Sequence, residues 1–412
     1  FSMLTALWVL ELRHDEKVAG ADDPFTPPAQ QVERGEYLAR AGDCAACHTA
    51  RGGRPYAGGR GIETPFGTVY ASNLTPDEQT GIGSWSAAHF QRALREGRSR
   101  DGHLLYPAFP YPNYTRVTRE DSDAIFAYLR SLPRVVQPNR AHELRFPYNT
   151  QAALAVWRIL FFKPGEYVPD SSHAAEWNRG AYLVGGLGHC GACHGERNVF
   201  GAMRGNPGLN GGLMPMTNWY APSLTSADEA GVAHWKRADI IALLKTGNSP
   251  HGSAMGPMAE VVFRSTQYLS EEDLGAIATY VGALPQTSAR TVAHVAELAP
   301  PLRARGEKVY RDHCADCHGR EGEGTPATWP ALAGNRAVTM TSANNPIRVV
   351  LSGGYLPATA GNPRPHGMPP FAQVLGDADI AAVLSYVRTS WGNAAAAVEP
   401  HNVTLLRQGR VN

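Results

Sequence analysis

The feature that most constrains how this 412-residue chain folds is a five-residue pattern, Cys-x-x-Cys-His, which occurs three times. The three copies end at His48, His194 and His318. Together they use every cysteine of the chain, namely Cys44, Cys47, Cys190, Cys193, Cys314 and Cys317. No cysteine remains for a disulfide or a separate reactive thiol, so each pair acts together with the histidine that follows it.

This pattern is the signature of covalent haem attachment. Residues three and four apart share one face of a helix, so Cys44 and Cys47 reach two positions of one porphyrin while His48 presents a nitrogen to the iron. A redox Cys-x-x-Cys pair needs no histidine after it, and a zinc site needs two pairs to converge, which leaves the third unmatched. We therefore predict three haem c groups. Because haem is attached after export, they place the protein in the periplasm or on the outer face of a bacterial membrane.

The chain repeats itself three times around these motifs. An amphipathic segment precedes each motif, and these segments read Arg34-Gly-Glu-Tyr-Leu, Arg179-Gly-Ala-Tyr-Leu and Arg305-Gly-Glu-Lys-Val-Tyr. A second helix is predicted to close each repeat, beginning near Asp121, Glu271 and Asp377. Acidic residues favour the positive end of the helix dipole, and apolar residues then recur at three- and four-residue spacing, which gives one buried stripe.

These repeats predict an all-α protein of three consecutive domains, each wrapped around one covalent haem, at residues 31–140, 176–290 and 300–395. Domains of about a hundred residues have thin cores, which a large apolar cofactor fills. The connecting segment 141–175 contains the run Trp157-Arg-Ile-Leu-Phe-Phe, which we expect to be helical and packed against the domains. Residues 1–30 form an N-terminal extension, and residues 396–412 are expected to form an extended tail.

Residues 1–10 are almost entirely apolar and precede a charged stretch. Ten residues are too few to cross a bilayer, which needs about twenty. We interpret them as the outer part of a signal-anchor helix or as an interfacial helix; an amphipathic segment docked on a partner subunit is the alternative. The chain has 38 Lys+Arg against 37 Asp+Glu and no basic tract, which argues against nucleic acid as a partner.

The second axial ligand of each iron decides between electron transfer and the binding of small molecules. A methionine opposite the histidine raises the reduction potential and closes the iron. In the third domain we predict Met368, which lies in a proline-rich loop before the last helix, over Met340. In the second domain we predict Met258, which follows Gly-Pro before the closing helix, and Met255 is close enough to compete.

The first domain departs from this pattern, because residues 31–140 contain no methionine. Phe109 stands where the ligand is expected. Phenylalanine cannot bind iron, so we expect this ring to pack against the porphyrin. The nitrogen candidates are His103 in the same loop, His89 on the preceding helix and His142 in the connecting segment. We rank His103 first; an open iron, or a ligand from another domain or subunit, is the alternative.

Three further stretches complete a family resemblance: the lead-in Arg34-Gly-Glu-Tyr-Leu-Ala-Arg-Ala-Gly-Asp-Cys44 and the loops Leu105-Tyr-Pro-Ala-x-Pro-Tyr and Gly256-Pro-Met-Ala-Glu-Val-Val. Over nearly its whole length the chain resembles the tri-haem cytochrome c subunit of bacterial membrane-bound dehydrogenases. The resemblance implies cytochrome c-type domains and an electron-transfer subunit that is not itself an enzyme. It would pass electrons from a catalytic dehydrogenase subunit to ubiquinone or the respiratory chain, anchored at the periplasmic face of the bacterial inner membrane.

The form Pro-Ala-Phe109-Pro-Tyr, together with an N-terminal anchor, is more similar to cytochromes that partner molybdopterin hydroxylases. That branch implies a molybdopterin-containing partner that oxidises aldehydes or N-heteroaromatics, with a small iron–sulfur subunit. The alternatives are the cytochrome subunit of a quinoprotein alcohol dehydrogenase or of a flavin-dependent sugar or gluconate dehydrogenase, which usually carries methionine in place of Phe109. A free-standing electron shuttle and a peroxidase-like haem enzyme are the other classes of function that remain.

Overall fold

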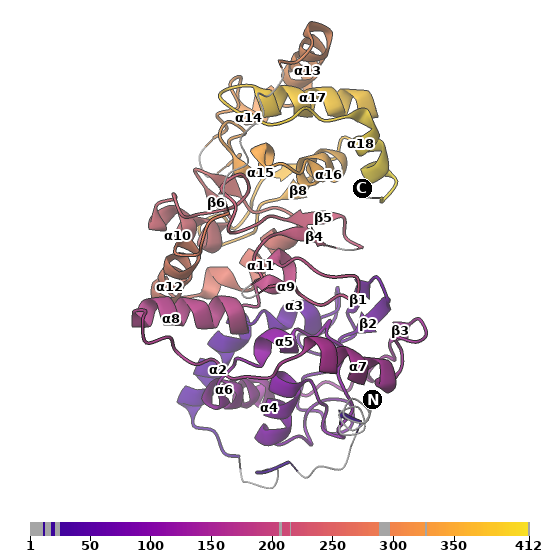
Figure 1. The fold of residues 1–412 in the computed structure, drawn as a ribbon, viewed down its shortest axis with the longest axis vertical. Coiled ribbons are helices and arrows are strands. Elements are labelled where there is room, and N and C mark those ends of the chain that lie inside the picture. Colours follow the sequence, from indigo (N-terminus) through magenta and orange to yellow (C-terminus); the bar gives the residue numbers. More distant parts are fainter. Residues whose placement is uncertain are drawn as a thin grey trace. The chain divides into compact units, whose positions relative to one another are not determined.

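The computed structural model of the chain describes residues 11–12, 18–20, 25–205, 208–214, 216–287, 297–325 and 328–410. They form helices joined by loops and a few short antiparallel strand pairs, as Figure 1 shows, so the predicted helical fold class is confirmed. The chain divides into two compact units, Phe1–Ala192 with Arg197–Arg204 and Cys193–Glu196 with Gly205–Asn412. The three domain boundaries stay a prediction, and the expected anchor at residues 1–10 lies outside the described residues.

The first unit carries most of the elements around the first motif. Its helices are α2 (Ala29–Ala41), α3 (Cys44–His48), α4 (Ala87–Glu96), α5 (Tyr111–Tyr114), α6 (Arg119–Ser131), α7 (Gln151–Phe161), α8 (Ala175–Tyr182) and the π-helix η1 (Leu183–Leu187). Its antiparallel sheet has the order β1 (Gly61–Thr64), β2 (Gly67–Tyr70) and β3 (Glu143–Leu144). The boundary between the units falls inside α9 (Gly191–His194), the helix of the second motif.

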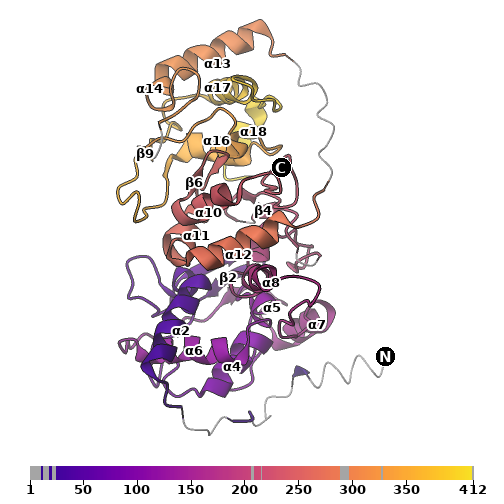
Figure 2. The ribbon, with the colours of Figure 1, turned by 90° about the vertical axis from the view of Figure 1, so that its left-hand side faces the viewer.

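The helix before the first motif packs tightly against the helix that closes its repeat, α2 against α6, and Figure 2 shows the two side by side. Gly35 makes the close approach possible, since a Cβ atom there would lie 1.8 Å from the carbonyl oxygen of Ala124. Arg34 extends from the same turn to Asp121 in the first turn of α6, with 2.6 Å between Nη2 and Oδ1. The Arg-Gly pair of the repeated segment is therefore the contact between the two helices.

The connecting segment is attached to this unit, as expected. β3 pairs with β2, and the Trp157 run lies in α7, whose start is capped by the side chain of Thr150 accepting from Ala153 N at 3.2 Å. Leu154 and Ala155 of α7 pack with Leu104 in a small buried cluster. Among the described residues, no helix combines the length and apolarity that crossing a bilayer requires.

The second unit holds the rest of the second repeat and the whole of the third. Its elements in the second repeat are β4 (Gly212–Met214), β5 (Trp219–Ala221), α10 (Arg237–Thr246), β6 (Asn248–Ser249), β7 (Gly252–Ser253), α11 (Pro257–Arg264), the 3₁₀ helix η2 (Thr266–Tyr268) and α12 (Glu271–Gly282). Those of the third are α13 (Pro300–His313), α14 (Ala315–His318), α15 (Arg336–Thr339), α16 (Asn344–Ser352), β8 (Gly354–Tyr355), β9 (Gly367–Met368), α17 (Asp377–Thr389) and α18 (Pro400–Arg407). The second and third repeats are joined by the side-chain amide of Asn345. Its oxygen accepts from the Tyr220 N–H at 2.9 Å, and its nitrogen donates to the Tyr220 carbonyl oxygen at 2.7 Å.

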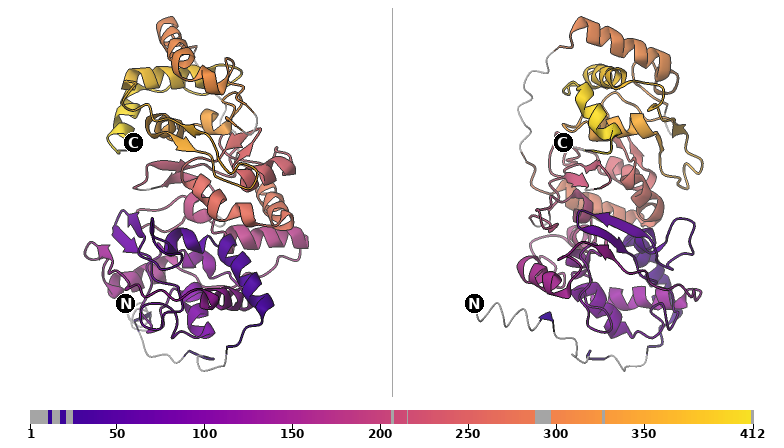
Figure 3. Two further views of the ribbon diagram at one scale, coloured as in Figure 1. Left: turned by 180° about the vertical axis from the view of Figure 1, so that it is seen from behind. Right: turned by 90° about the vertical axis from the view of Figure 1, so that its right-hand side faces the viewer.

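The third repeat copies the helix contact of the first. Figure 3 shows α13 (orange) against α17 (yellow). A Cβ atom on Gly306 would lie 2.3 Å from the carbonyl oxygen of Ala382, and Arg305 pairs with Asp379 at 2.8 Å. The same Arg-Gly dipeptide thus makes the same contact in two repeats.

The expectation of an extended C-terminal tail is wrong for residues 400–407, which form α18. Proline opens the helix at a position where no backbone donor is needed, and Val403 and Leu406 join the buried core of the third repeat. Arg407 bonds Asp377 at 2.7 Å. The tail is helical because its apolar pair covers a surface that α16 and α17 leave open.

Candidate haem sites

The three motif histidines are held in the same way. In each, Nδ1 lies within hydrogen-bond distance of a backbone carbonyl oxygen further along the chain. The pairs are His48 with Ser72 at 2.7 Å, His194 with Pro222 at 2.7 Å and His318 with Pro330 at 3.0 Å. A carbonyl oxygen only accepts, so Nδ1 carries the proton and the lone pair of the imidazole is on Nε2.

A second contact is also shared by the three repeats. The carbonyl oxygen of each motif histidine accepts from the backbone N–H of a glycine, and these glycines are Gly58, Gly211 and Gly324, each at 2.8 Å. Their φ angles are 77, 80 and 64°, a left-handed conformation that favours glycine. At Gly58 a Cβ atom would also lie 2.5 Å from the carbonyl carbon of Ser72. The loop that returns to the histidine is therefore built alike three times.

Burial lowers the pKa of all three motif histidines, and the hydrogen bond to the backbone carbonyl opposes this only in part. Each ring is therefore neutral near pH 7, which is the form that binds a metal. Neutral imidazole with its tautomer set by a carbonyl is the usual arrangement of a histidine ligand. With two cysteines beside each histidine, these residues fit haem c, whose iron would gain and lose one electron.

A zinc site is not supported. Such a site gathers three or four cysteine, histidine or carboxylate ligands. Among the residues that the structure describes, no three side chains of these types come together. Each Cys-x-x-Cys-His therefore stands alone, as haem attachment requires.

The two predicted methionine ligands lie in different local structures of the second unit. Met258 is in the first turn of α11, half-buried. The preceding turn closes at Gly256, with φ of 56°, where a Cβ atom would lie 2.4 Å from the ring of Trp219. Met368 is half-buried in β9, paired with Gly354 of β8.

The competing methionines are placed elsewhere. The methyl carbon of Met255 reaches to 3.0 Å from where a Cβ atom would stand on Gly354, so this side chain meets the hairpin that carries Met368. Met340 is buried, and its carbonyl oxygen accepts from Arg388 at 3.1 Å. Neither contact tests which methionine binds iron, so the choice of Met258 and Met368 stays a prediction.

Phe109, in the first repeat, is half-buried in an aromatic cluster. Its ring centroid lies 5.5 Å from that of Tyr114 and 6.4 Å from that of Tyr111. His103, in contrast, is exposed over 58% of its side chain, and its Nδ1 atom lies 2.7 Å from Asp101. The structure does not bring His103 into the buried aromatic cluster, and its role as a ligand stays a prediction.

Hydrogen bonds at Nδ1 set His142 apart from the other two candidate histidines of the first repeat. Nδ1 of His142 lies 3.2 Å from the N–H of Tyr70, and a ring whose Nδ1 accepts from an N–H carries its proton on Nε2. Nδ1 of His89 lies 2.8 Å from the Ser86 hydroxyl, which can donate or accept, and 3.3 Å from the Ser86 N–H. Nδ1 of His103 faces the Asp101 carboxylate, which leaves Nε2 the lone pair.

One link between the first two motifs was not foreseen. The hydroxyl of Tyr114 donates to the carbonyl oxygen of Gly42 at 2.9 Å and lies 3.5 Å from Nδ1 of His189. Gly42 is two residues before Cys44, and His189 directly precedes Cys190. The first unit therefore brings the entries to two attachment motifs together through one buried tyrosine. The one signal for this Tyr114–His189 contact in the sequence is that His189 directly precedes the second motif.

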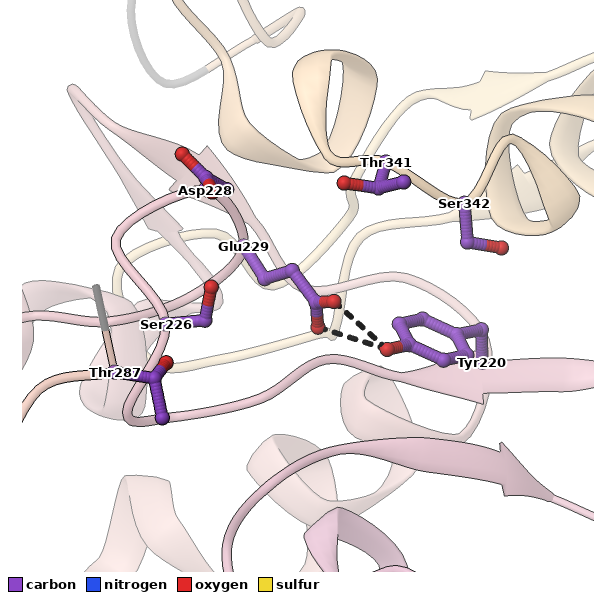
Figure 4. Close-up of a pocket in the computed structure, with 7 residues that line it drawn as sticks. All are labelled: Tyr220, Ser226, Asp228, Glu229, Thr287, Thr341 and Ser342. Carbon is purple, nitrogen blue, oxygen red and sulfur yellow. Dashed lines mark hydrogen bonds between the residues drawn. The ribbon is translucent and has the colours of Figure 1, made fainter. Parts of the chain in front are cut away.

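A cavity of about 410 Å³ lies in the second unit. Figure 4 shows the residues that line it. Its lining is polar and comprises Tyr220, Ser226, Asp228, Glu229, Thr287, Thr341 and Ser342. The Glu229 carboxylate already accepts from the Tyr220 hydroxyl at 2.8 Å and from the Ser223 N–H at 2.6 Å. Polar groups of this cavity are therefore already partly paired within the chain.

The cytochrome c family profile matches residues 32–133 and 303–391, which include the first and third motifs. The cytochrome c subunit of a quinone-dependent alcohol dehydrogenase from Gluconacetobacter polyoxogenes is 38% identical over 410 residues, covering 95% of this chain and 87% of the relative. The chain belongs to the cytochrome c subunits of dehydrogenase complexes. Its role is therefore electron transport, and it binds covalent haem c.

Two further relatives widen the range of partner enzymes. A nicotinate dehydrogenase subunit from Pseudomonas putida is 43% identical over 379 residues, covering 89% of this cytochrome and 31% of the relative. The gluconate 2-dehydrogenase cytochrome c subunit of Pantoea cypripedii is 39% identical over 397 residues, covering 92% and 89%. The prediction of a dehydrogenase partner is confirmed at this level, and the kind of dehydrogenase is not decided.

Proposed function

We propose that this cytochrome subunit carries three haem c groups and passes electrons from a periplasmic dehydrogenase subunit to ubiquinone or the respiratory chain. The observation that carries the count of three is the repeated histidine geometry. The second motif lies outside the family-profile match. His194 nevertheless makes the same two kinds of contact as His48 and His318, one to a backbone carbonyl oxygen and one to a glycine N–H. The subunit is anchored at the periplasmic face of the inner membrane through residues 1–10 and has no catalytic site of its own.

Each haem is held by residues of one repeat. Thioether bonds form to Cys44 and Cys47, to Cys190 and Cys193, and to Cys314 and Cys317. His48, His194 and His318 bind the three irons, Met258 and Met368 complete the second and third, and His103 is the ligand we assign to the first. Phe109 packs against the first porphyrin. Two fixed ligands favour fast transfer, because little rearrangement accompanies the change of charge.

The proposed partner is a molybdopterin dehydrogenase with a small iron–sulfur subunit, acting on an aldehyde or an N-heteroaromatic compound. Two observations support it. The nicotinate dehydrogenase relative is 43% identical, against 38% and 39% for the alcohol and gluconate relatives, and nicotinate is an N-heteroaromatic acid. Phe109 also replaces the methionine usual in the alcohol and sugar branches. An alcohol, sugar or gluconate dehydrogenase is the second candidate, since those relatives align along nearly their whole length.

The test is purification of the native complex, followed by mass spectrometry and haem analysis. We expect three haems to remain after acid–acetone extraction, a catalytic subunit with bound molybdopterin, and reduction of the cytochrome by an aldehyde or a heteroaromatic acid. A pyrroloquinoline quinone or flavin in the catalytic subunit would transfer the assignment to the second candidate. Two haems, or a cytochrome that oxidises a substrate unaided, would contradict the proposal itself.

A further inference from the structure

Helix α7 (Gln151–Phe161) is apolar on both of its sides. Leu154, Ala155 and Arg158 face inward, each at most 5% exposed. On the other side Val156 is 46% and Leu160 is 62% exposed. Apart from the buried Arg158 the helix has no charged residue, whereas a helix that covers a soluble domain presents charged and polar side chains to water. Its outer side therefore lacks the composition of a water-facing surface.

The apolar surface continues beyond the helix on the side of residues 199–201. The ring of Phe161 stacks on that of Phe200, with centroids 5.8 Å apart and 28° between the planes. The Trp157 indole donates to the carbonyl oxygen of Phe200 at 2.9 Å. Phe200 and its neighbour Val199 are 54% and 85% exposed. This loop is thus fixed to α7 with its apolar side chains facing outward.

On a further side the surface reaches the segment that precedes α7. The ring of Phe66 packs on that of Tyr148 at 4.5 Å and lies 3.1 Å from where a Cβ atom would stand on Gly201. Tyr148 is 40% exposed and Phe146 is 82% exposed. We call these exposed apolar side chains together the α7 surface; it consists of Phe146, Tyr148, Val156, Leu160, Val199 and Phe200. Large contiguous apolar surfaces mark a site of contact with another protein or with a membrane.

The chain leading from residues 1–10 is attached to the same helix. The Glu11 carboxylate bonds Arg158 at 2.9 Å and Arg98 at 2.8 Å. Leu12 packs on the cluster that includes Leu154 of α7. The apolar sequence of residues 1–10 therefore continues directly from residues that are held against α7. These contacts lie on the inward side of α7, and Val156 and Leu160 lie on its outer side.

The exposed cations at the rim favour a lipid surface as the occupant. Exposed cations flank the surface, with Arg145 directly before Phe146 and Lys163 two residues after α7 ends. Tyrosine and tryptophan, here Tyr148 and Trp157, are the residues enriched where a protein meets lipid headgroups. Cations beside an apolar face attract anionic lipid.

We propose that the α7 surface inserts into the headgroup–acyl boundary of a phospholipid bilayer, as a second membrane contact beside residues 1–10. The proposal rests on the proposed membrane attachment and not on the identity of the dehydrogenase. A second contact of this kind adds buried apolar area to the membrane attachment and strengthens it.

The test measures binding of the full-length, haem-loaded cytochrome to vesicles of phosphatidylethanolamine and phosphatidylglycerol by flotation. The variant is Val156→Gln with Leu160→Gln, and the matched control is Val374→Gln, an apolar residue of the second unit that is 63% exposed. We expect the double variant to bind about tenfold more weakly, since two aliphatic side chains no longer enter the apolar phase. The control should bind as the native protein does.

A second pair of proteins separates the two contacts. Deletion of residues 1–10 should weaken vesicle binding and leave a residual part, which the added Val156→Gln and Leu160→Gln changes abolish. Unchanged binding of the full-length double variant would overturn the proposal. So would a double variant that binds vesicles normally and separates from its catalytic subunit, because the surface would then belong to a protein interface. Haem content and reduction by the dehydrogenase report on the proposed function and should not change.

Discussion

The hydroxyl oxygen of Tyr114 lies 3.5 Å from Nδ1 of His189, and the two rings meet edge to face with centroids 5.4 Å apart. Tyr114 belongs to the first repeat, and His189 is the residue before the second attachment motif. The same hydroxyl bonds the carbonyl oxygen of Gly42, just before the first motif. One buried side chain therefore joins the residues that lead into the first two attachment motifs, within the first unit.

Tyr114→Phe tests this relation. The variant keeps the ring and loses a hydrogen bond to a buried carbonyl, which costs about 1 kcal/mol. We expect the amides around Gly42 and His189 to exchange with deuterium about fivefold faster, with three haems still attached. Hydrogen-exchange mass spectrometry of the two peptides measures the change. If exchange rises at one motif only, Tyr114 does not couple the two.

The ion pairs Arg34–Asp121 and Arg305–Asp379 can be compared by removing the carboxylate of each. The Asp121 side chain is 3% exposed, and it binds Arg34 through Oδ1 and the Tyr182 hydroxyl through Oδ2, both at 2.6 Å. Asp121→Ala should destabilise α6 by about 2 kcal/mol, because the buried Tyr182 hydroxyl loses its acceptor and the ion pair with the half-exposed Arg34 is lost. Asp379, bonded to Arg305, is 30% exposed, so Asp379→Ala should cost less than about 1 kcal/mol. Exchange protection of α6 and α17 compares them, and equal losses would contradict the argument.

Acid should destabilise the first unit through Asp77. Hydrogen bonds from the Thr80 hydroxyl, the Thr80 N–H and Arg134 lower the pKa of Asp77 from 3.8 to about 2. A carboxyl with a lowered folded-state pKa contributes stability that is fully present above its unfolded pKa and is lost as pH falls toward the folded value. Stability should therefore fall between about pH 4 and pH 2. Asp77→Asn should flatten this part of the profile, which acid titration followed by circular dichroism measures.

The methionine assignments are tested by opening the iron. Met258→Ala and Met368→Ala should each create one haem that binds carbon monoxide and should lower that haem's midpoint potential, because a thioether ligand raises the potential. Met255→Ala is the matched control, since the Met255 methyl group meets Gly354. Optical titration of the reduced protein counts the open haems. An open haem in Met255→Ala and none in Met258→Ala would exchange the two assignments.

The first haem should be the lowest-potential centre, because nitrogen replaces sulfur as its second ligand. We expect low-temperature EPR of the native protein to show one bis-histidine signal beside two His/Met signals. His103→Ala should convert the first to high spin. His142→Ala is the control, since its Nδ1 atom is already occupied by the Tyr70 N–H. Three His/Met signals in the native protein would exclude His103 and mean that a methionine from another domain or subunit is the ligand of this iron.

Local chemistry explains why much of this protein was predictable. In each motif the second cysteine and the histidine lie on one turn of helix, and the first cysteine lies in that turn or directly before it. The spacing of the motif alone identifies haem attachment. The closing helices expected near Asp121, Glu271 and Asp377 appear as α6, α12 and α17, because an acidic first turn and an apolar stripe are local signals.

Tertiary structure alone decided the rest. The carbonyl partners of the motif histidines are Ser72, Pro222 and Pro330, which lie 24, 28 and 12 residues away, so no sequence interval predicts them. The folding of residues 400–407 into α18 depended on the surface they cover. Such contacts join residues that only the folded chain brings together, whereas the sequence by itself determined where each haem is attached, because covalent attachment depends on one turn of helix.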